Sequence, residues 1–339
     1  LVEELVGDLL GVLQEFLANS LFPLLQPAVG VGSTFEGWSP NEDQAVYRLL
    51  VPLRPPHGHA FHLELGTSRE ILAKGSRVRV ELECTCTWEQ LVENTPCFLH
   101  YPEEELRRKP SLLSTLCSGS YLDVQKTARW LQNLVRSAWL LVPQSRHYNM
   151  KVLPSSRSCK LQLTNIAGVT LCVELLFGVQ QGSSDIFLSS QAREAIFTPS
   201  TMWPESYAVA EAKFFRHMAL HDTCHLKCLQ VCTRILMGTG FSNYIMKTVV
   251  MHLLNTIPPS RWSREEFLLW LQHIMEYLHG CLEEKRLNHF FFGNENVPKE
   301  IVLPPTFELA EPLNLFQHLL HDKHAHAKAL LEFDELQDR

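Results

Sequence analysis

The sequence predicts an α+β protein, with a lobe of strands and helices over residues 1–200 and a helical lobe over residues 201–339. Before Ser200, several segments alternate apolar and polar residues, which is typical of half-buried strands. After Ser200, apolar residues recur at helical spacing, and we expect no strand there. Strands first and helices later indicate two lobes, and 339 residues suffice for two domains of about 100–200 residues each.

The first lobe opens with a predicted amphipathic helix. Apolar residues from Val2 to Leu17 follow the i, i+3, i+4 spacing, and the helix should end between Asn19 and Pro23. A glycine-containing turn at residues 30–38 follows. The remaining predictions are a helix over 121–142 and strands over 43–53, 61–65, 77–86, 159–163 and 169–179.

The second lobe is predicted to be helical throughout, because its apolar residues keep a period near 3.6. The predicted helices are residues 205–220, 224–237, 242–255, 264–284 and 312–332.

The composition is that of an ordinary globular protein. Apolar residues make up 45% of the chain, and the formal net charge is −7. This excludes general disorder, collagen-like sequence and a broadly basic nucleic-acid binder. A short basic run at residues 107–109 is expected to be a solvated loop, so we predict no nucleic-acid partner.

The ten cysteines are too few for a disulfide scaffold. We expect free thiols in a reducing compartment. Cys84 and Cys86 share one face of a predicted strand, but lie about 6–7 Å apart by strand rise, which is awkward for a bridge. An extracellular domain with two or three bridges remains the alternative.

No segment of the sequence has the pattern of a membrane-spanning helix. The longest uncharged stretch, from Phe16 to Phe35, contains Pro23 and Pro27. No signal peptide is visible. Since the chain starts at Leu1, inside a helical pattern, we expect further sequence to precede it.

The turn at Gly32 and Ser33 is a candidate phosphate site, because backbone N–H groups in such a turn can hold phosphate oxygens. Two carboxylates at i, i+2 on the following strand would share a face and could hold Mg²⁺ ions. In this sequence Glu42 and Gln44 are expected to share that face, while Asp43 points the other way.

These residues belong to a longer series of motifs that resembles the Mab-twenty-one family of nucleotidyltransferase-fold proteins, which includes cyclic GMP–AMP synthase. The motifs occur in order along nearly the whole chain: G-S-T-F-E, S-P-N-E-D-Q-A-V-Y-R-L-L-V-P, W-P-E-S-Y, C-L-Q, S-N-Y-I-M-K-T, R-W-S-R-E-E-F and E-E-K-R-L-N-H-F-F.

Within that family, V-G-S-T-F-E-G-W, H-L-K-C-L and A-E-P-L-N-L-F are most similar to the inositol trisphosphate receptor-interacting proteins. The resemblance implies a mixed-sheet nucleotidyltransferase-like lobe, a helical lobe and a cleft between them. It also implies a membrane receptor or another protein as partner. It further implies a single-pass membrane protein, attached through a segment N-terminal to this chain, with this domain on the cytosolic side.

The resemblance matches the family's three metal-binding acids to Glu42, Gln44 and Glu174 of this sequence. It matches the family's phosphate-binding pair to Gly32 and Ser33. Glutamine is neutral and offers Mg²⁺ only an amide oxygen. The resemblance therefore implies a degenerate metal site without a cofactor, and a pseudo-nucleotidyltransferase rather than an enzyme.

Two further family positions bear on the nucleotide side of the site. The phosphate-contacting lysine falls on Gln230, and the base-stacking tyrosine falls on Tyr244. The tyrosine has a second interpretation, because an aromatic residue at a helix start often fills the core.

The synthase carries a zinc loop in the region where this chain has His217, His221, Cys224 and Cys228. The loop is shorter here and the ligand spacing is not reproduced, so core cysteines and solvated histidines are the favoured interpretation over zinc. A second histidine cluster at residues 318–326 is expected to be a polar helix face near the C-terminus.

Three functions remain open from the sequence. The favoured one is a non-catalytic domain that acts through protein–protein interaction. A residual nucleotidyltransferase would need Asp43 or Glu36 as the third carboxylate. A sensor of nucleotides or inositol phosphates would bind an anion at the Gly32–Ser33 turn without chemistry.

Overall fold

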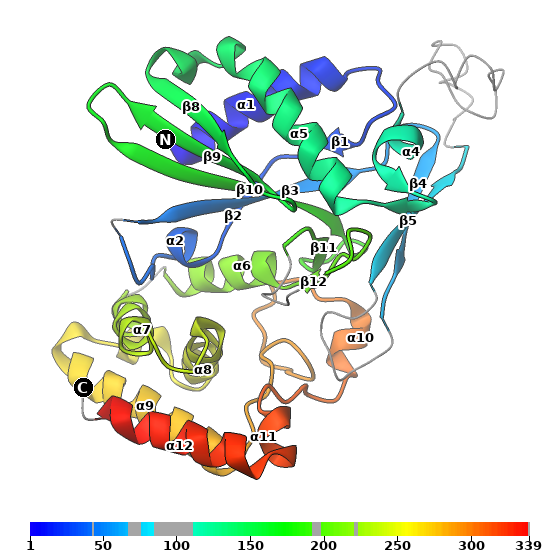
Figure 1. Cartoon of the computed structure of the whole chain (residues 1–339). Coiled ribbons are helices and arrows are strands. Elements are labelled where there is room, and N and C mark those ends of the chain that lie inside the picture. Colours follow the sequence, from blue (N-terminus) through cyan, green and yellow to red (C-terminus); the bar gives the residue numbers. More distant parts are fainter. Residues whose placement is uncertain (43, 67–75, 85–110, 192–197, 220–222, 338–339) are drawn as a thin grey trace. The chain divides into compact units, whose positions relative to one another are not determined.

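The structure, a computed structural model, describes residues 1–42, 44–66, 76–84, 111–191, 198–219 and 223–337 (Figure 1). The chain divides into two compact units. The sheet unit comprises Leu1–Val31 and Val46–Val209, and the helical unit comprises Gly32–Ala45 and Ala210–Arg339.

The sheet unit is built on a mixed eight-stranded sheet. At its centre β3 and β10 run parallel, with Val46 opposite Cys172 and Pro52 opposite Gly178. The other pairings in this sheet are antiparallel, including β9 with both β8 and β10. The strands are β1 (Leu24–Leu25), β2 (Val29–Val31), β3 (Val46–Arg54), β8 (Tyr148–Leu153), β9 (Cys159–Asn165), β10 (Thr170–Gln180), β11 (Phe187–Ser189) and β12 (Glu205–Ser206).

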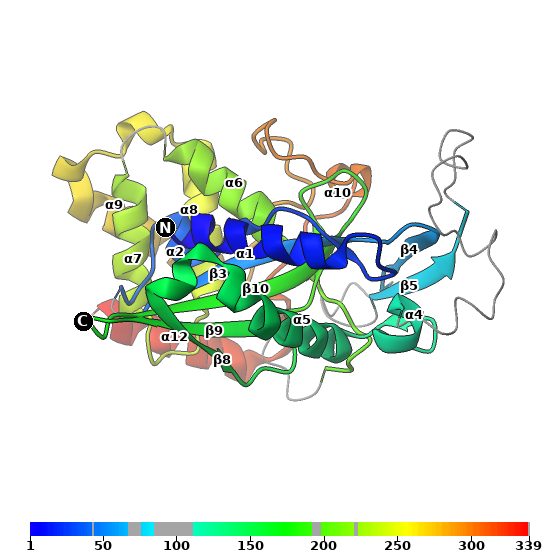
Figure 2. The same cartoon turned by 90° about the horizontal axis from the view of Figure 1, so that it is seen from above.

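Two helices, α1 (Val2–Leu17) and α5 (Val124–Ala138), cover the same face of this sheet (Figures 1 and 2). The apolar stripe of α1 is buried from Val2 to Leu17, as its spacing predicts. Asp123 caps α5, because its Oδ1 accepts hydrogen bonds from the backbone N–H groups of Gln125 (2.9 Å) and Lys126 (3.0 Å). The buried apolar stripe thus holds α1 on the sheet, and the Asp123 cap defines where α5 begins.

A second, four-stranded sheet in the same unit has the order β4-β5-β7-β6. Its strands are antiparallel, and the short helix α4 precedes β6 in the chain. The elements are β4 (His59–Glu64), β5 (Arg77–Leu82), α4 (Leu112–Thr115), β6 (Cys117–Ser118) and β7 (Tyr121–Leu122).

The helical unit has a core in which α7, α8 and α9 contact one another and α12 packs on α9. Trp262 and Trp270 stack inside it, with ring centroids 4.4 Å apart. Its helices are α2 (Ser33–Glu36), the greater part of α6 (Ala208–Met218), α7 (Cys224–Ile235), α8 (Asn243–Thr256), α9 (Phe267–Glu283), α10 (Pro305–Glu308), α11 (Gln317–His321) and α12 (Lys323–Gln337). This unit also has 3₁₀ turns at Pro259–Arg261 and Arg264–Glu266, and the sheet unit has 3₁₀ turns at Trp139–Leu141 and Pro143–Arg146. Within the described ranges, no helix combines the length and the apolar character needed to cross a bilayer.

The strand predicted over residues 43–53 begins at Val46. Glu42 therefore lies in a bend and Gln44 in a turn ahead of β3, and the alternation of a strand does not put them on one face. The segment before β3 also groups with the helical unit, although it stands early in the sequence. The predicted strand over 77–86 ends at Leu82 as β5, and residues 85 and 86 lie outside the described ranges.

The expectation of no strand after Ser200 is wrong. Glu205–Ser206 forms β12, which pairs with Phe187 and Leu188 of β11, so the helix predicted from residue 205 starts at Ala208. The edge of β11 pairs with Glu205 and Ser206 and so draws these two residues into the sheet. This pairing depends on a distant strand and is invisible to local periodicity.

Two other predicted helices are interrupted by aspartates that cap a new helix. Asp123 ends the β7 pairing and starts α5, so the helix predicted from residue 121 begins at Val124. Asp322 separates α11 from α12 and accepts hydrogen bonds from the backbone of His324 (2.9 Å) and Ala325 (3.0 Å).

Candidate functional site

The first predicted metal ligand, Glu42, is an exposed residue of the helical unit, and its carboxylate is hydrogen-bonded to a side chain of α7. Its Oε1 accepts a hydrogen bond of 2.7 Å from Nε2 of Gln230. The same nitrogen donates to the carbonyl of Ser39 over 2.8 Å. Gln230 is only 5% exposed, so this amide is held in one orientation. Gln230, which the resemblance aligns with a phosphate-contacting lysine, thus holds the Glu42 segment in this chain.

Two further side chains of α7 support this arrangement. Lys227 Nζ donates to Oε1 of Gln230 over 2.8 Å, which fixes which end of the amide faces Glu42. Arg234 Nε donates to the carbonyl of Pro40 over 2.6 Å. Residues 39–42 are therefore tied to one helix at three points, and this explains why they group with the helical unit.

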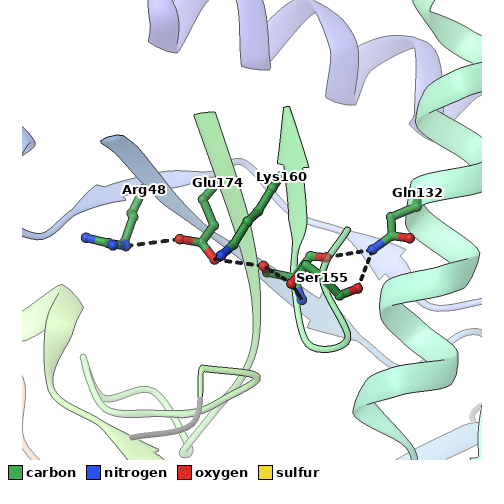
Figure 3. Close-up of polar contacts among 6 residues, drawn as sticks. Arg48, Gln132, Ser155, Lys160 and Glu174 are labelled. Atoms are coloured by element: carbon green, nitrogen blue, oxygen red, sulfur yellow. Dashed lines mark hydrogen bonds and ion pairs between the residues drawn. The ribbon is translucent and has the colours of Figure 1, made fainter. Parts of the chain in front are cut away.

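The third predicted metal ligand, Glu174, is a nearly buried residue of the sheet unit whose two carboxylate oxygens both have protein partners (Figure 3). Arg48 Nε lies 3.1 Å from Oε2, and Ser158 Oγ donates to Oε1 over 2.7 Å. Lys160 Nζ lies 3.8 Å from Oε1. The carboxylate is thereby neutralised from two sides.

Strand register places both cations beside Glu174. Arg48 is its partner on the parallel strand β3, and Lys160 is its partner on the antiparallel strand β9. The side chains of Arg48 and Lys160 are 37% and 46% exposed, whereas that of Glu174 is 11% exposed. Solvent therefore screens the two ion pairs, and the bond from Ser158 is the most buried of the three.

The loop that supplies Ser158 is held by α5. Gln132 Nε2 donates to the carbonyls of Ser155 (2.9 Å) and Ser158 (2.8 Å), and the two serine hydroxyl oxygens lie 2.8 Å apart (Figure 3). Glu174 consequently has a second layer of support that keeps its hydrogen-bond donor in place.

These partners weigh against a two-metal site of the nucleotidyltransferase kind. Divalent ions need anionic oxygens, and here Gln44 is neutral while Glu174 faces two cations. Among the residues that the structure describes, no group of three His, Cys, Asp or Glu side chains could hold a metal ion. Asp43, one alternative for the third carboxylate, lies outside the described residues.

Glu36, the other alternative, is part of a buried triad with Lys247 and Glu211 in the helical unit. Lys247 Nζ lies 2.8 Å from Oε1 of Glu36 and 2.5 Å from Oε2 of Glu211. Trp38 Nε1 donates to Oε2 of Glu36 over 2.6 Å. Glu36 is therefore fully engaged within the core and does not supply a carboxylate to a metal.

Burial and ion pairing have opposing effects on the pKa values of the triad. Burial raises the pKa of Glu36, although Lys247 opposes the shift. For Lys247, burial alone favours the neutral amine, but Glu211 and Glu36 outweigh it and its pKa lies above the ordinary value. The rings of Trp38 and Phe215 lie 5.8 and 5.6 Å from the ammonium, which adds cation–π stabilisation.

The Gly32–Ser33 turn starts the four-residue helix α2. Gly32 has φ +81°, a left-handed conformation that favours glycine. The carbonyl of Ser33 accepts hydrogen bonds from the N–H groups of Gly37 and Trp38, both at 3.0 Å. The turn is thus well formed, and phosphate binding at it remains a prediction.

Tyr244, the predicted base-stacking residue, lies in the first turn of α8. Its hydroxyl oxygen is 2.7 Å from Nε2 of His289, which is 1% exposed. The ring is half-buried. This contact supports the interpretation as a core aromatic residue, and stacking on a base stays untested.

The zinc candidates are engaged with protein groups. Cys224 and Cys228 have their sulfur atoms 3.9 Å apart, and Cys224 donates to the carbonyl of Ser263 over 3.3 Å. Burial raises the pKa of Cys228 well above its usual range, which disfavours the thiolate that binds metal. His217 Nδ1 lies 3.8 Å from Oε1 of Glu300, and His221 lies outside the described residues.

The described cysteines are free thiols: Cys84, Cys117, Cys159, Cys172, Cys224, Cys228, Cys232 and Cys281. Cys86 and Cys97 lie outside the described ranges, as does the basic run at residues 107–109. In the C-terminal histidine cluster, His318, His321 and His324 are exposed, whereas His326 Nε2 lies 2.9 Å from the carbonyl of Leu282.

Comparison with known proteins agrees with this architecture. Residues 224–302 match the family described as "Mab-21 protein HhH/H2TH-like domain". That match, together with the mixed sheet that carries Glu174, is consistent with the nucleotidyltransferase-like fold of Mab-21 proteins.

Similarity over nearly the whole of this chain narrows the class of protein. The chain is 35% identical to inositol 1,4,5-trisphosphate receptor-interacting protein-like 1 of Mus musculus, and the match covers 99% of this chain and 64% of that protein. It is 30% and 29% identical to the inositol 1,4,5-trisphosphate receptor-interacting proteins of Bos taurus and Homo sapiens, of which it covers 65% and 66%. The chain is thus homologous over 99% of its length to inositol 1,4,5-trisphosphate receptor-interacting proteins, and it spans 64–66% of the length of these relatives.

Proposed function

We propose that this chain is a non-catalytic nucleotidyltransferase-fold domain that acts through protein–protein interaction. The observation that carries the proposal is the position of Glu174 between Arg48 and Lys160, with Ser158 on its remaining oxygen. Phosphoryl transfer with two metal ions needs a cluster of negative charge. A divalent ion at Glu174 would have to displace two cations and a buried hydrogen bond.

The other two acid positions support the same conclusion. Gln44 contributes no charge, and the Glu42 carboxylate already accepts a hydrogen bond from Gln230. Replacing the family's lysine by Gln230 also removes a positive charge from the nucleotide side. Each change weakens metal or phosphate binding independently of the others.

The names of the relatives support a protein partner. The relatives are named for interaction with the inositol 1,4,5-trisphosphate receptor, and we propose a membrane receptor or another protein as the partner of this chain. We also propose attachment of the whole protein to a membrane through a segment N-terminal to this chain, with this domain in the cytosol. Protease protection of the full-length protein in sealed vesicles tests the topology: this domain should be digested without detergent.

The test of the catalytic claim is a turnover assay. The purified chain is incubated with Mg²⁺ or Mn²⁺ and each nucleoside triphosphate, singly and in pairs, and products are separated by chromatography. We expect no product above the protein-free blank. A product that forms with this chain and disappears with Glu42→Ala, while the thermal unfolding of that variant is unchanged, would contradict the proposal.

A second candidate function, an anion sensor, is favoured by the partial exposure of Arg48 and Lys160. These side chains retain donors that face solvent and could contact a phosphate without a metal. Calorimetric titration with ATP, GTP or an inositol phosphate in the presence of EDTA tests it. Binding that weakens in Arg48→Gln would support the sensor.

A further inference from the structure

A groove with positively charged lining runs along α5 in the sheet unit, and its described lining includes neither Glu174 nor the side chains that contact Glu174. Its volume is about 350 Å³. Six of its lining residues lie on α5, and Thr115 at the end of α4 completes the described lining; α4 lies beside the N-terminal end of α5 (Figures 1 and 2). The α5 residues are Lys126, Arg129, Trp130, Asn133, Leu134 and Ser137.

The charge of this lining contrasts with that of the whole chain. The groove has two cations, Lys126 and Arg129, and the described lining holds no carboxylate, whereas the chain as a whole carries a net charge of −7. Arg129 is exposed and forms no ion pair or hydrogen bond with any other residue of the described ranges. A guanidinium without a protein partner on a helix surface is available for a carboxylate ligand.

The other groups at the groove are held in position. Lys126 Nζ donates to the carbonyl of Cys117 over 2.6 Å, which fixes the ammonium beside the groove and leaves two of its donors. The Trp130 ring stacks on Phe22 with centroids 5.4 Å apart and an interplanar angle of 18°. The indole and Leu134 thus form an apolar surface next to fixed positive charge, so little ordering is needed on binding.

The length of the groove indicates an extended ligand. Lys126 and Ser137 are three helical turns apart, which corresponds to about 16 Å along the helix axis. An extended peptide covers this distance with about five residues and places alternate side chains on one side. Asn133, Ser137 and Thr115 offer side-chain hydrogen bonds to its backbone.

We propose that the α5 groove binds a short acidic peptide segment of a partner protein, with carboxylates on Lys126 and Arg129 and an aliphatic side chain on Trp130 and Leu134. This assignment rests on the proposed interaction function and names the surface that performs it. Charge complementarity decides the chemistry of the occupant, because a basic or neutral segment would leave the two cations uncompensated.

The experiment uses the full chain and an array of five-residue peptides built from Glu, Gln and Leu, followed by fluorescence anisotropy on the best binder with a label at its N-terminus. We expect peptides with Glu at two positions and Leu between or beside them to bind, and the matched Gln peptides to bind at least tenfold more weakly. Affinity should fall as salt is raised.

The matched variants place the same charge change inside and outside the groove, in the same unit. Arg129→Glu should weaken binding at least tenfold, whereas Arg146→Glu, at an exposed residue of the 3₁₀ turn Pro143–Arg146 that is not part of the lining, should change it less than threefold. Both variants should unfold at the same temperature as the parent. Equal loss in both variants, equal binding of Gln peptides, or absence of binding at millimolar peptide would each overturn the assignment.

Inorganic phosphate and ATP serve as competitors. Displacement of the peptide by millimolar phosphate alone would show a small-anion site instead of a peptide groove, and would also overturn the proposal. No nucleotide product is measured in the anisotropy titrations, so a negative result here leaves the proposed absence of catalysis standing, and turnover in the earlier assay leaves this groove untouched.

Discussion

Arg48 Nε lies 3.1 Å from Oε2 of Glu174, directly across the parallel pair β3 and β10. The resemblance to nucleotidyltransferases predicts a metal-binding role for this carboxylate position, whereas in this chain the carboxylate contacts an arginine of the neighbouring strand. The pairing is built into the register of the sheet, so it is present whenever the sheet is folded.

Restoring the missing acid alone should not restore activity. Gln44→Asp returns one negative charge, but Glu174 keeps its partners on β3 and β9 and Gln230 keeps its bond to Glu42. We expect no nucleotide product from the single variant in the assay with Mg²⁺ and Mn²⁺. Turnover by Gln44→Asp would show that one missing charge had silenced an otherwise competent site.

Lys247→Met should destabilise the protein strongly. It leaves Glu36 and Glu211 buried without a counter-charge, and removing one partner of a buried ion pair costs about 3–5 kcal/mol. Urea denaturation followed by circular dichroism measures the change. Lys227→Met on α7 is the matched control, because Lys227 is exposed, and it should cost about 1 kcal/mol or less. Equal effects in the two variants would refute the role of the triad.

Because of Asp123, the free energy of unfolding should depend on pH in the acidic range. Burial alone would raise its pKa, but hydrogen bonds from Ser200, the Lys126 backbone and Ser118 outweigh burial and hold the pKa below its ordinary value. A depressed carboxylate stabilises the fold above the unfolded-state pKa, near 4, and loses this contribution as pH falls through the folded value.

The comparison for this prediction is Asp123→Asn, which can still cap α5 through its amide oxygen but does not titrate. Unfolding free energies are measured in urea from pH 7 down to the acid transition. The parent should lose more stability below pH 4 than the variant does. Parallel curves for the two proteins would mean that Asp123 has the same pKa in both states.

Local pattern was sufficient for elements with a distinct apolar stripe or run. The apolar stripe of α1 was predicted from its helical spacing, and β10 was predicted from a nearly continuous apolar run. By contrast, β12 exists because β11 offers an edge, and the start of β3 at Val46 reflects the ties of Ser39 and Pro40 to α7. Such boundaries depend on partners that are distant in sequence.

The motifs supplied the candidate positions Glu42, Gln44 and Glu174, and their role as a degenerate metal site stays a prediction. The motifs carry no information on strand register, and register is what brings Arg48 and Lys160 to Glu174. Lys247 stood within the S-N-Y-I-M-K-T motif without a predicted role. Its function became clear only when Glu36 and Glu211 were placed beside it in the core.

The central claim is that the Glu174 carboxylate contacts cationic side chains of the protein instead of a metal ion. Titrating the chain with Mn²⁺ and measuring free Mn²⁺ by electron paramagnetic resonance tests this claim most directly. The account predicts no saturable site in the micromolar range, and the same titration curve for the parent, Glu174→Gln and Glu42→Ala. A saturable site in that range that is lost in both variants would contradict it.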